Sequence, residues 1–389
     1  MAGSRLMIDL MRESDNARYM DTHFDVNNMN STQPINGSVC YPLTEDFAPR
    51  MLYLKLEEVI TAVVLPIILV LGLSTNMSFL YVVGKVRSMH TVTNAYLVNL
   101  AVGDMLFLIV VISDKLWSFY TSELYSDHST RSTFSCTALN IISFTTLFTC
   151  EFLLTAVAAE RYYAICHPYR SARLDRRHLS RNIIASLWII SACLGLTMTP
   201  AFCKLTSYCI IWPDDEKYDY LPTEWAACSY VHIIARIYGD MLRAIPFFVV
   251  LIVNVVLYSL IIKELTNKGK NECETQAKTS RIIRNQVAMM LIVNTAVFFA
   301  LMSPFNVMSV IMMFDSLRTK RLLTPEGRRI CILFTRLLSY CNSVVNPLIY
   351  KAMNARYRKA FVIAFGCSKE NHEAADVTEK TNTSTAFTS

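Results

Sequence analysis

Four charged side chains fall within or beside long apolar stretches, where a charge is costly. Asp104, Glu151 and Arg336 each interrupt an apolar run. Arg243 stands just before another run. A charge within a lipid-spanning helix costs roughly 2.5 to 3.5 kcal/mol on insertion scales, so such residues usually face the interior of a helix bundle and serve a function. We therefore expect these four residues to line polar sites inside a bundle.

Patterns that would indicate catalysis or metal binding are missing from the sequence. It contains no GxGxxG phosphate loop, no HExxH motif and no arrangement that predicts a catalytic triad. Its cysteines do not follow metal-binding spacings. We therefore expect a protein that is not an enzyme and that holds no metal centre.

Seven apolar runs supply the elements that would position these charges. The chain is 53% hydrophobic and 17% charged, whereas soluble domains are about 25% charged. Each run is about as long as, or longer than, the roughly 20 residues that cross a bilayer, and none alternates like a strand of a membrane barrel. Buried helices of a soluble protein are the alternative, but the wholly uncharged runs argue against it. The runs are 59–84, 93–116, 137–159, 182–203, 244–262, 287–314 and 330–350. We predict an all-α membrane protein, a bundle of seven transmembrane helices with a short amphipathic eighth helix.

Basic residues predict how the chain is oriented in the membrane. The connections after the first, third and fifth runs, and the segment after the seventh, are rich in lysine and arginine. Such an excess marks the cytoplasmic side. The basic loop before the seventh run, with Arg318 and Arg329, is an exception. We expect a multi-pass plasma-membrane protein with an extracellular tail over 1–54 and a membrane domain over 55–353.

The two ends of the chain carry candidate modification sites. Asn30 and Asn36 begin acceptor patterns for N-glycosylation. Residues 354–367 predict an amphipathic helix whose basic residues meet anionic lipid. Cys367 is a candidate palmitoylation site, with a free thiol as the alternative. The cytoplasmic tail over 368–389 is rich in serine and threonine, whose phosphorylation would recruit an arrestin; a plain solvated tail is the alternative.

Three motifs occur in the order, and in the runs, where one receptor family carries them. The second run contains NAYLVNLAVGDMLF, the third ends in ERYYAICHP and the seventh ends in NSVVNPLIY. On these motifs the chain resembles the rhodopsin-like G-protein-coupled receptors over about residues 55–367. Further landmarks of the resemblance are Asn76, Trp188, Pro246, Tyr258, Phe298 and Pro304. ERYYAICHP, RNQV at 284–287 and RLLSYCNSVVNP also resemble thyrotropin-releasing-hormone receptors and related invertebrate neuropeptide receptors.

The resemblance implies a conformational switch at the end of the third run. Glu160 would hold Arg161 in an ion pair at rest, and release would let Arg161 reach a heterotrimeric G protein, with tyrosine hydroxyls as partners. A simple interfacial anchor pair is the alternative. Prolines permit helix kinks, which suit a two-state bundle. The implied switch residues are Glu160, Arg161, Tyr162, Tyr258, Phe298, Pro304, Asn346, Pro347 and Tyr350.

The resemblance also implies a buried polar network, which in many family members binds a sodium ion. The corresponding residues are Asp104, Asn342, Ser343 and Asn346. Cys150 stands where a serine is usual, so one oxygen ligand is lost and the site is weakened for sodium. A water-filled network without an ion is the alternative. We expect no other cofactor.

A disulfide is implied at the outer end of the third helix. From Cys136 to Arg161 is 25 residues, about 37 Å of helix at 1.5 Å per residue, so the two lie at opposite faces of the membrane. An outer cysteine is in an oxidising compartment and can form a disulfide. The family places its partner in the loop before the fifth helix, where Cys209 and Cys228 compete. We favour Cys228 because it lies closer to the start of that helix.

Two residues depart from the family pattern. Met302 replaces the tryptophan that usually stands two residues before the sixth-helix proline. Glu151 replaces an aliphatic residue that touches Pro246 and Phe298 in the family. Because a buried unpaired carboxylate is costly, we hypothesise a core ion pair between Glu151 and Arg243. A protonated Glu151 bonded to a backbone carbonyl is the alternative.

The residues facing the expected cavity favour a peptide ligand. Ser143 stands where amine receptors carry an aspartate, and Tyr340 stands where opsins carry the retinal lysine, so neither ligand class is expected. The long tail and the acidic, aromatic loop over 204–230 suit peptide capture. Arg336 would hold a carbonyl, a C-terminal amide or a carboxylate. The candidate ligand-binding residues are Arg336, Tyr340, Ser143, Phe144, Phe148, Phe305 and Asn306. We expect a neuropeptide receptor; the alternatives are a chemosensory small-molecule receptor and a non-signalling seven-helix protein.

Overall fold

The computed structural model describes residues 33–35, 38–169, 175–271, 275–317 and 322–366. Three predicted modification sites, Asn30, Asn36 and Cys367, lie outside the described residues, as does the tail over 368–389.

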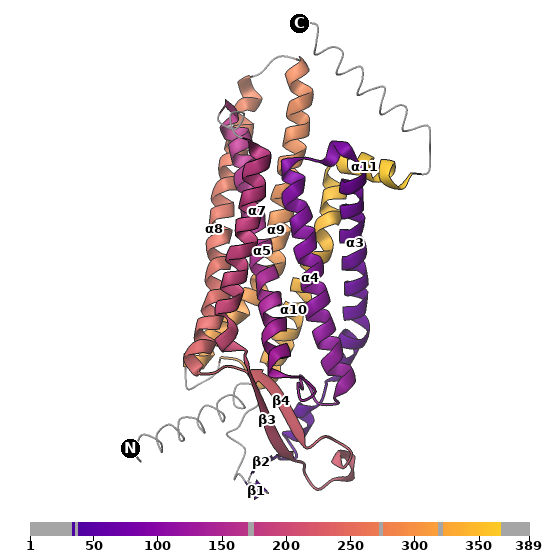
Figure 1. Cartoon of the computed structure of the whole chain (residues 1–389), viewed down its shortest axis with the longest axis vertical. Coiled ribbons are helices and arrows are strands. Elements are labelled where there is room, and N and C mark those ends of the chain that lie inside the picture. Colours follow the sequence, from indigo (N-terminus) through magenta and orange to yellow (C-terminus); the bar gives the residue numbers. More distant parts are fainter. Residues whose placement is uncertain (1–32, 36–37, 170–174, 272–274, 318–321, 367–389) are drawn as a thin grey trace.

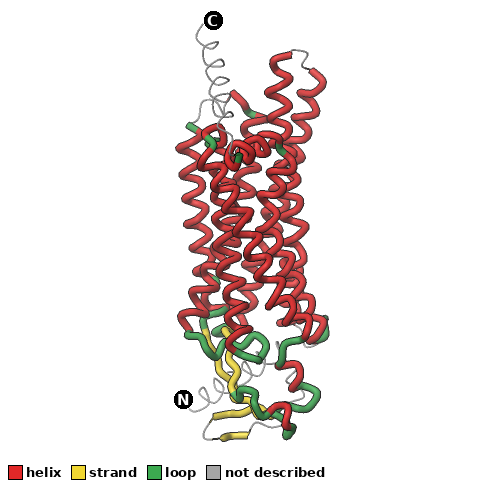
Figure 2. The backbone as a smooth tube through the Cα atoms, turned by 90° about the vertical axis from the view of Figure 1, so that its right-hand side faces the viewer, coloured by secondary structure: helices red, strands yellow, loops and turns green. Residues whose placement is uncertain are grey.

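Among the described residues, seven long helices form the body of the molecule, and they run side by side (Figures 1 and 2). The first consists of α2 (Lys55–Val59), a π-helical turn (Ile60–Val64) and α3 (Leu65–Lys85). Among the described helices, six are long and apolar enough to cross a membrane. The seventh, α10, is less apolar because it carries several arginines. The other helices are α4 (Val92–Thr121), α5 (Thr133–Cys166), α7 (Arg176–Thr197), α8 (Ile233–Asn271), α9 (Thr275–Leu317) and α10 (Pro325–Met353). The predicted seven-helix bundle is confirmed.

Polar side chains fix where several helices begin. Thr91, Ser132, Asp175 and Thr324 precede α4, α5, α7 and α10, and each accepts a hydrogen bond from a backbone N–H of the first turn. Such caps satisfy N–H groups that have no partner within the helix. The caps therefore set the ends of the helices, while the apolar runs set their length.

The core of the bundle is centred on α5, which packs against α4, α7, α8 and α9. Leu97, Phe148, Phe247 and Phe298 are among its fully buried side chains. Many large apolar residues instead face outward, and the side chain of Ile252 is 64% exposed. Outward apolar faces suit a lipid environment, in which helices associate by close packing rather than by the hydrophobic effect.

A small sheet caps one end of the bundle (Figure 1). Its strands are β1 (Gln33–Ile35), β2 (Ser38–Pro42), β3 (Lys204–Ile211) and β4 (Glu224–Ser229), in that order across the sheet. β2 and β3 pair in parallel, and the other two pairs are antiparallel. A second apolar core, which includes Phe47, Met51, Leu124 and Trp225, lies under this sheet. The sheet was not predicted from the sequence.

At the opposite end, α11 (Ala355–Phe365) lies across the bundle (Figure 1). It occupies the segment where the short amphipathic helix is expected. The Tyr357 hydroxyl donates a hydrogen bond to Asn94, and burial raises the pKa of Tyr357, which keeps that donor protonated. Lys85 Nζ donates to the carbonyl of Ala364 at 2.8 Å. These contacts tie α11 to the ends of α3 and α4.

Candidate functional site

A cavity of about 300 Å³ lies at the sheet end of the bundle, lined by residues of α4, α5, α8, α9 and α10 and by residues in and after β4. Trp225 and Cys228 of the hairpin formed by β3 and β4 contribute to its wall. Five of the seven predicted ligand-binding residues line it, namely Ser143, Phe144, Phe305, Arg336 and Tyr340. The structure therefore brings together residues from three helices, α5, α9 and α10, that the sequence analysis could only place separately.

The other two predicted ligand-binding residues, Phe148 and Asn306, are not brought into the cavity. Both are fully buried. Phe148 stacks on Phe152 at 6.3 Å between ring centroids, one turn deeper along α5 than Phe144. Asn306 Nδ2 donates back to the carbonyl of Met302 at 3.1 Å within α9. Packing within the bundle thus occupies both side chains.

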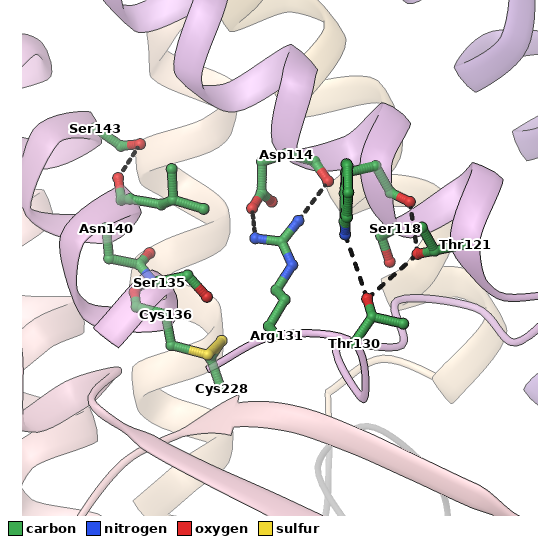
Figure 3. A network of polar contacts seen from close by, with 12 residues as sticks. Asp114, Ser118, Thr121, Thr130, Arg131, Ser135, Cys136, Asn140, Ser143 and Cys228 are labelled. Carbon is green, nitrogen blue, oxygen red and sulfur yellow. Dashed lines mark hydrogen bonds and ion pairs between the residues drawn. A yellow bond between two sulfur atoms is a disulfide. The ribbon is translucent and has the colours of Figure 1, made fainter. Parts of the chain in front are cut away.

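A charged wall of the cavity was missed as a site. Asp114 and Lys115, in the last turns of α4, line the cavity, and Arg131 reaches it from the loop before α5. Figure 3 shows the Arg131 guanidinium pointing at Asp114. Arg131 forms an ion pair with the Asp114 carboxylate, and its Nη2 donates to the Asp114 carbonyl at 2.9 Å. The available signal was the pair of charges at the end of the second apolar run.

A histidine from the same loop completes this wall. His128 lines the cavity beside the charged residues. Burial, and next the neighbouring Lys115 ammonium, lower the pKa of His128 to about 4. The ring is therefore neutral at physiological pH, and the positive charge of this wall comes from lysine and arginine.

Two disulfides fasten the sheet. Cys136, at the start of α5, is bonded to Cys228 of β4 (Figure 3), which confirms the favoured pairing. Cys209 of β3 is bonded instead to Cys40 of β2. This second bond was not predicted, although Cys40 in the tail and the leftover Cys209 were the available signal. Together they hold the hairpin over the cavity and the N-terminal strand against the hairpin.

The hypothesised ion pair between Glu151 and Arg243 is wrong. Arg243 Nη2 lies 3.8 Å from Asp240 Oδ1, one turn earlier on α8, and its Nη1 donates to Ser309 at 3.2 Å. The Glu151 side chain is fully buried. Neither of its carboxyl oxygens has a hydrogen-bond partner among the described residues, so the alternative bond to a backbone carbonyl is not formed either. The rotation of α8 directs Arg243 towards the cavity, where its guanidinium carbon lies 5.3 Å from the ring centre of Phe144.

The predicted polar network around Asp104 is assembled in the middle of the bundle. Asn346 Nδ2 donates to Asp104 Oδ2 at 2.7 Å, and the Cys150 thiol lies 4.0 Å from Asp104 Oδ1. Asn342 and Ser343 are buried beside them on α10. Within the described residues, the side-chain oxygens of Asn342 and Asn346 have no hydrogen-bond partner. The oxygen atoms fit a hard cation or water, whereas the thiol of Cys150 does not.

The predicted switch residues lie at the end of the bundle opposite the cavity. Arg161 Nε donates to Glu160 at 2.6 Å, so the expected ion pair is present. Arg161 also bonds to Thr93. Arg176, which was not singled out as a switch residue, forms a second ion pair with Glu160. Arg176, in the first turn of α7, thus gives the Glu160 carboxylate a second positively charged partner.

The remaining switch residues are not joined to Arg161 by hydrogen bonds. The Tyr258 hydroxyl pairs with Thr295 at 3.1 Å. The Tyr350 hydroxyl has no partner among the described residues. Tyr162 lies 3.4 Å from the His167 ring nitrogen. Phe298 packs against Phe247 and Phe299, and Pro304 and Pro347 lie inside α9 and α10.

Comparisons with known proteins agree with this arrangement. The sequence profile of the 7 transmembrane receptor (rhodopsin family) matches residues 75–350. The thyrotropin-releasing hormone receptor of Gallus gallus is 29% identical over 336 residues, which is 78% of each chain. The corresponding receptor of Homo sapiens is 27% identical over 357 residues, 84% of this chain and 82% of its own. Somatostatin receptor type 5 of Rattus norvegicus is 26% identical over 309 residues, 77% of each chain.

Proposed function

Because the chain belongs to the rhodopsin family of seven-transmembrane receptors, we propose that it binds a short neuropeptide in the cavity under the hairpin and activates a heterotrimeric G protein. Members of this family are receptors and not enzymes. The relatives reported above are named as receptors for thyrotropin-releasing hormone and for somatostatin. Peptides with an amidated C-terminus are included in the proposal.

The observation that carries the proposal is the composition of the cavity. Arg336, Tyr340 and Phe305 all line it. A planar donor fork next to aromatic rings suits backbone carbonyls, a terminal amide and aromatic side chains. A cavity of about 300 Å³ is at the lower end of the size that holds a small ligand. It would therefore accept the end of a peptide, with the rest against the hairpin.

The proposal places the sheet end outside the cell and α11 at the cytoplasmic face of the plasma membrane. The two disulfides at the sheet end support this orientation, because disulfides persist in oxidising compartments. Arg356 and Arg358 on α11 would meet anionic lipid. The tail beyond α11 would recruit an arrestin once phosphorylated.

Activation would begin at the cavity and end at Arg161. Met302 lines the cavity floor, and Phe298 lies one turn below it in α9, packed against Phe247 of α8. A ligand that shifts Met302 would therefore shift this aromatic contact between α8 and α9. Breaking the bonds of Glu160 to Arg161 and Arg176 would then free Arg161 for the G protein. A bundle with two conformations can couple the two ends in this way, because a ligand that binds one conformation more tightly shifts the equilibrium towards it.

Cells expressing the full chain test the proposal. Calcium and cyclic-AMP responses would be measured against a library of neuropeptides supplied in amidated and free-acid forms. We expect at least one peptide to activate the wild type and to lose activity in Arg336→Ala at unchanged surface expression. The matched control is Arg50→Ala, a partly exposed arginine at the same end of the molecule. Silence across the library, with the protein at the surface, would favour a small-molecule or non-signalling role.

A further inference from the structure

We propose that the cavity recognises a negatively charged group of its ligand, held between Lys115 of α4 and Arg336 of α10. The inference rests on the proposed binding of a peptide in this cavity and names the chemistry that the peptide must carry. Its basis is the balance of charges in the cavity wall and the way in which those charges are partnered.

The cavity wall carries more positive than negative charge. Its acidic residues are Asp114 and Asp240. Its basic residues are Lys115, Arg131, Arg236, Arg243 and Arg336. Five cations against two carboxylates leave a formal surplus of three positive charges. A cavity with low-dielectric walls focuses such a field and attracts ligands of the opposite sign.

Both carboxylates are already engaged by other arginines. Arg131 forms its ion pair and a backbone hydrogen bond with Asp114, and the exposed fraction of the Arg131 side chain is only 6%. Asp240 lies beside Arg243 on the same face of α8. Arg243 is held further by Ser309 and by the rings of Phe144 and Phe305. These two ion pairs belong to the wall itself, so they do not neutralise the remaining cations.

Three cations are left over. The Arg236 guanidinium lies over the ring of Tyr230 at 5.7 Å, which leaves Lys115 and Arg336. Neither side-chain head forms a hydrogen bond or an ion pair within 4.0 Å with the residues that the structure describes. Asp114 attracts Lys115 over a longer distance, but Lys115 and Arg336 also repel each other. The other carboxylate near them, Glu57, is bound by Arg329. Two like charges therefore line the same cavity, and within the described residues neither is bonded to an anion.

The position of this pair within the cavity is favourable for capture of a ligand group. Lys115, Arg336 and Tyr340 line both the main cavity and a smaller one of about 50 Å³ that adjoins it towards α2. The pair therefore stands where the two cavities meet. Placing an anion there would replace repulsion by attraction in a desolvated setting, where charge pairs are strong.

The ligand group is accordingly an oxyanion. Arg336 can bind a carboxylate or sulfate through two parallel N–H donors, and Lys115 can supply a point charge from the opposite side. In a peptide this group has two sources, an acidic side chain and a free C-terminal carboxylate. The two sources share the same chemistry, and the peptide experiment below separates them.

The first test uses a minimal probe and needs no agonist. Thermal unfolding of the purified full-length receptor would be followed with millimolar N-acetyl-glutamate amide and, in parallel, N-acetyl-glutamine amide, which differ only in charge. We expect the acidic probe to raise the unfolding temperature more than the neutral one, because ligand binding stabilises the folded state by mass action. The difference should vanish in Lys115→Met and survive in Lys55→Met, a lysine exposed at the same end.

Unliganded Lys115→Met should also unfold at a higher temperature than the wild type, because one of two repelling charges is removed. A cooperative unfolding transition at that higher temperature would show that the variant folds. Equal stabilisation of the wild type by both probes would overturn the proposal. So would a difference between the probes that persists in Lys115→Met.

The second test uses any peptide that activates the receptor, made in four versions: glutamate or glutamine at its acidic positions, and a free or amidated C-terminus. We expect removal of one of these charges to reduce potency by about 30-fold or more, the loss typical of a desolvated charge pair without its partner. Equal potency of all four versions would overturn the proposal. Silence of every peptide would contradict the proposed function, while the probe experiment would still decide the anion site.

Discussion

The side chain of Glu151 places a carboxyl group in the middle of α5, where no described residue bonds to it. A polar group buried without a partner costs about 1 to 3 kcal/mol in proteins. We predict that Glu151→Leu raises the free energy of unfolding by about that amount. The measurement is the shift in thermal unfolding temperature of the detergent-solubilised receptor.

The control for this prediction is Glu58→Leu, which removes an exposed carboxylate from α2 and should change stability by less than about 0.5 kcal/mol.

The same unfolding assay tests whether Glu151 and Arg243 form an ion pair. Because Glu151 and Arg243 do not touch, the effects of Glu151→Leu and Arg243→Leu should add within about 0.5 kcal/mol. A coupling of several kcal/mol between them would mean that an ion pair forms after all.

We expect Cys150 to weaken the response of the network around Asp104 to sodium. Its thiol lies 4.0 Å from the Asp104 carboxylate, where an oxygen ligand would favour a hard cation. We predict that replacing choline in the buffer by sodium raises the thermal unfolding temperature of Cys150→Ser more than that of the wild type. Asn346→Ala should abolish the gain, since it removes an unpartnered amide oxygen. A sodium effect already as large in the wild type would refute the role given to Cys150.

At the scale of elements, Arg329 ties the start of α10 to the segment before α3. Its Nε donates to Glu57 Oε1 at 2.6 Å, and its two other nitrogens reach the carbonyls of Arg50 and Leu52, each at 2.7 Å. Its guanidinium also lies 3.7 Å from the ring centre of Tyr125. Removing one partner of a buried ion pair costs about 3 to 5 kcal/mol. Arg329→Ala should therefore lower the unfolding temperature and the surface expression strongly.

Two variants check that this loss comes from the stranded charge. Arg50→Ala removes only a partly exposed side chain and should remain close to the wild type. The double variant Glu57→Leu with Arg329→Leu should recover part of the loss, because apolar residues of similar volume replace buried pairs at little cost. A double variant as unstable as Arg329→Ala would show that the backbone hydrogen bonds, not the charges, dominate.

The loop between α4 and α5 makes stability depend on pH. The pKa of His128 is lowered from 6.5 to about 4. Between pH 6.5 and pH 4, His128 is therefore protonated in the unfolded chain and neutral in the folded one. The contribution of His128 to stability is intact above pH 6.5 and falls towards pH 4, by about 1.4 kcal/mol per pH unit at most. His128→Gln should remove this part of the acid sensitivity of unfolding. An unchanged pH profile in the variant would contradict the assignment.

The whole molecule shows what the sequence could and could not predict. The seven helices follow from their apolar runs, because a membrane allows few alternatives to a helix. The Cys136–Cys228 bond was favoured because the family resemblance implies it and because Cys228 lies close to the start of α8, and the position of Arg336 in the cavity was expected from the same resemblance. These features depend on local sequence or on a recognised pattern, so they are readable without coordinates.

Features that depend on pairing between distant segments were missed. The contact of β2 with β3 joins segments about 169 residues apart, and the short strands give little signal of their partner. Arg131 could not be matched to Asp114 for the same reason. The error at Glu151 arose because the rotation of α8, which decides where Arg243 points, is set by packing rather than by periodicity alone.

The central claim is that a peptide in the cavity controls Arg161 at the other end of the bundle. Its most direct test is guanine-nucleotide exchange on a purified heterotrimeric G protein, catalysed by the receptor reconstituted in lipid nanodiscs with an activating peptide. We predict that the peptide accelerates exchange with the wild type, that Arg336→Ala removes the acceleration, and that Arg161→Ala abolishes exchange while peptide binding persists. Wild-type potency in Arg336→Ala, or exchange that does not respond to the peptide, would contradict the account.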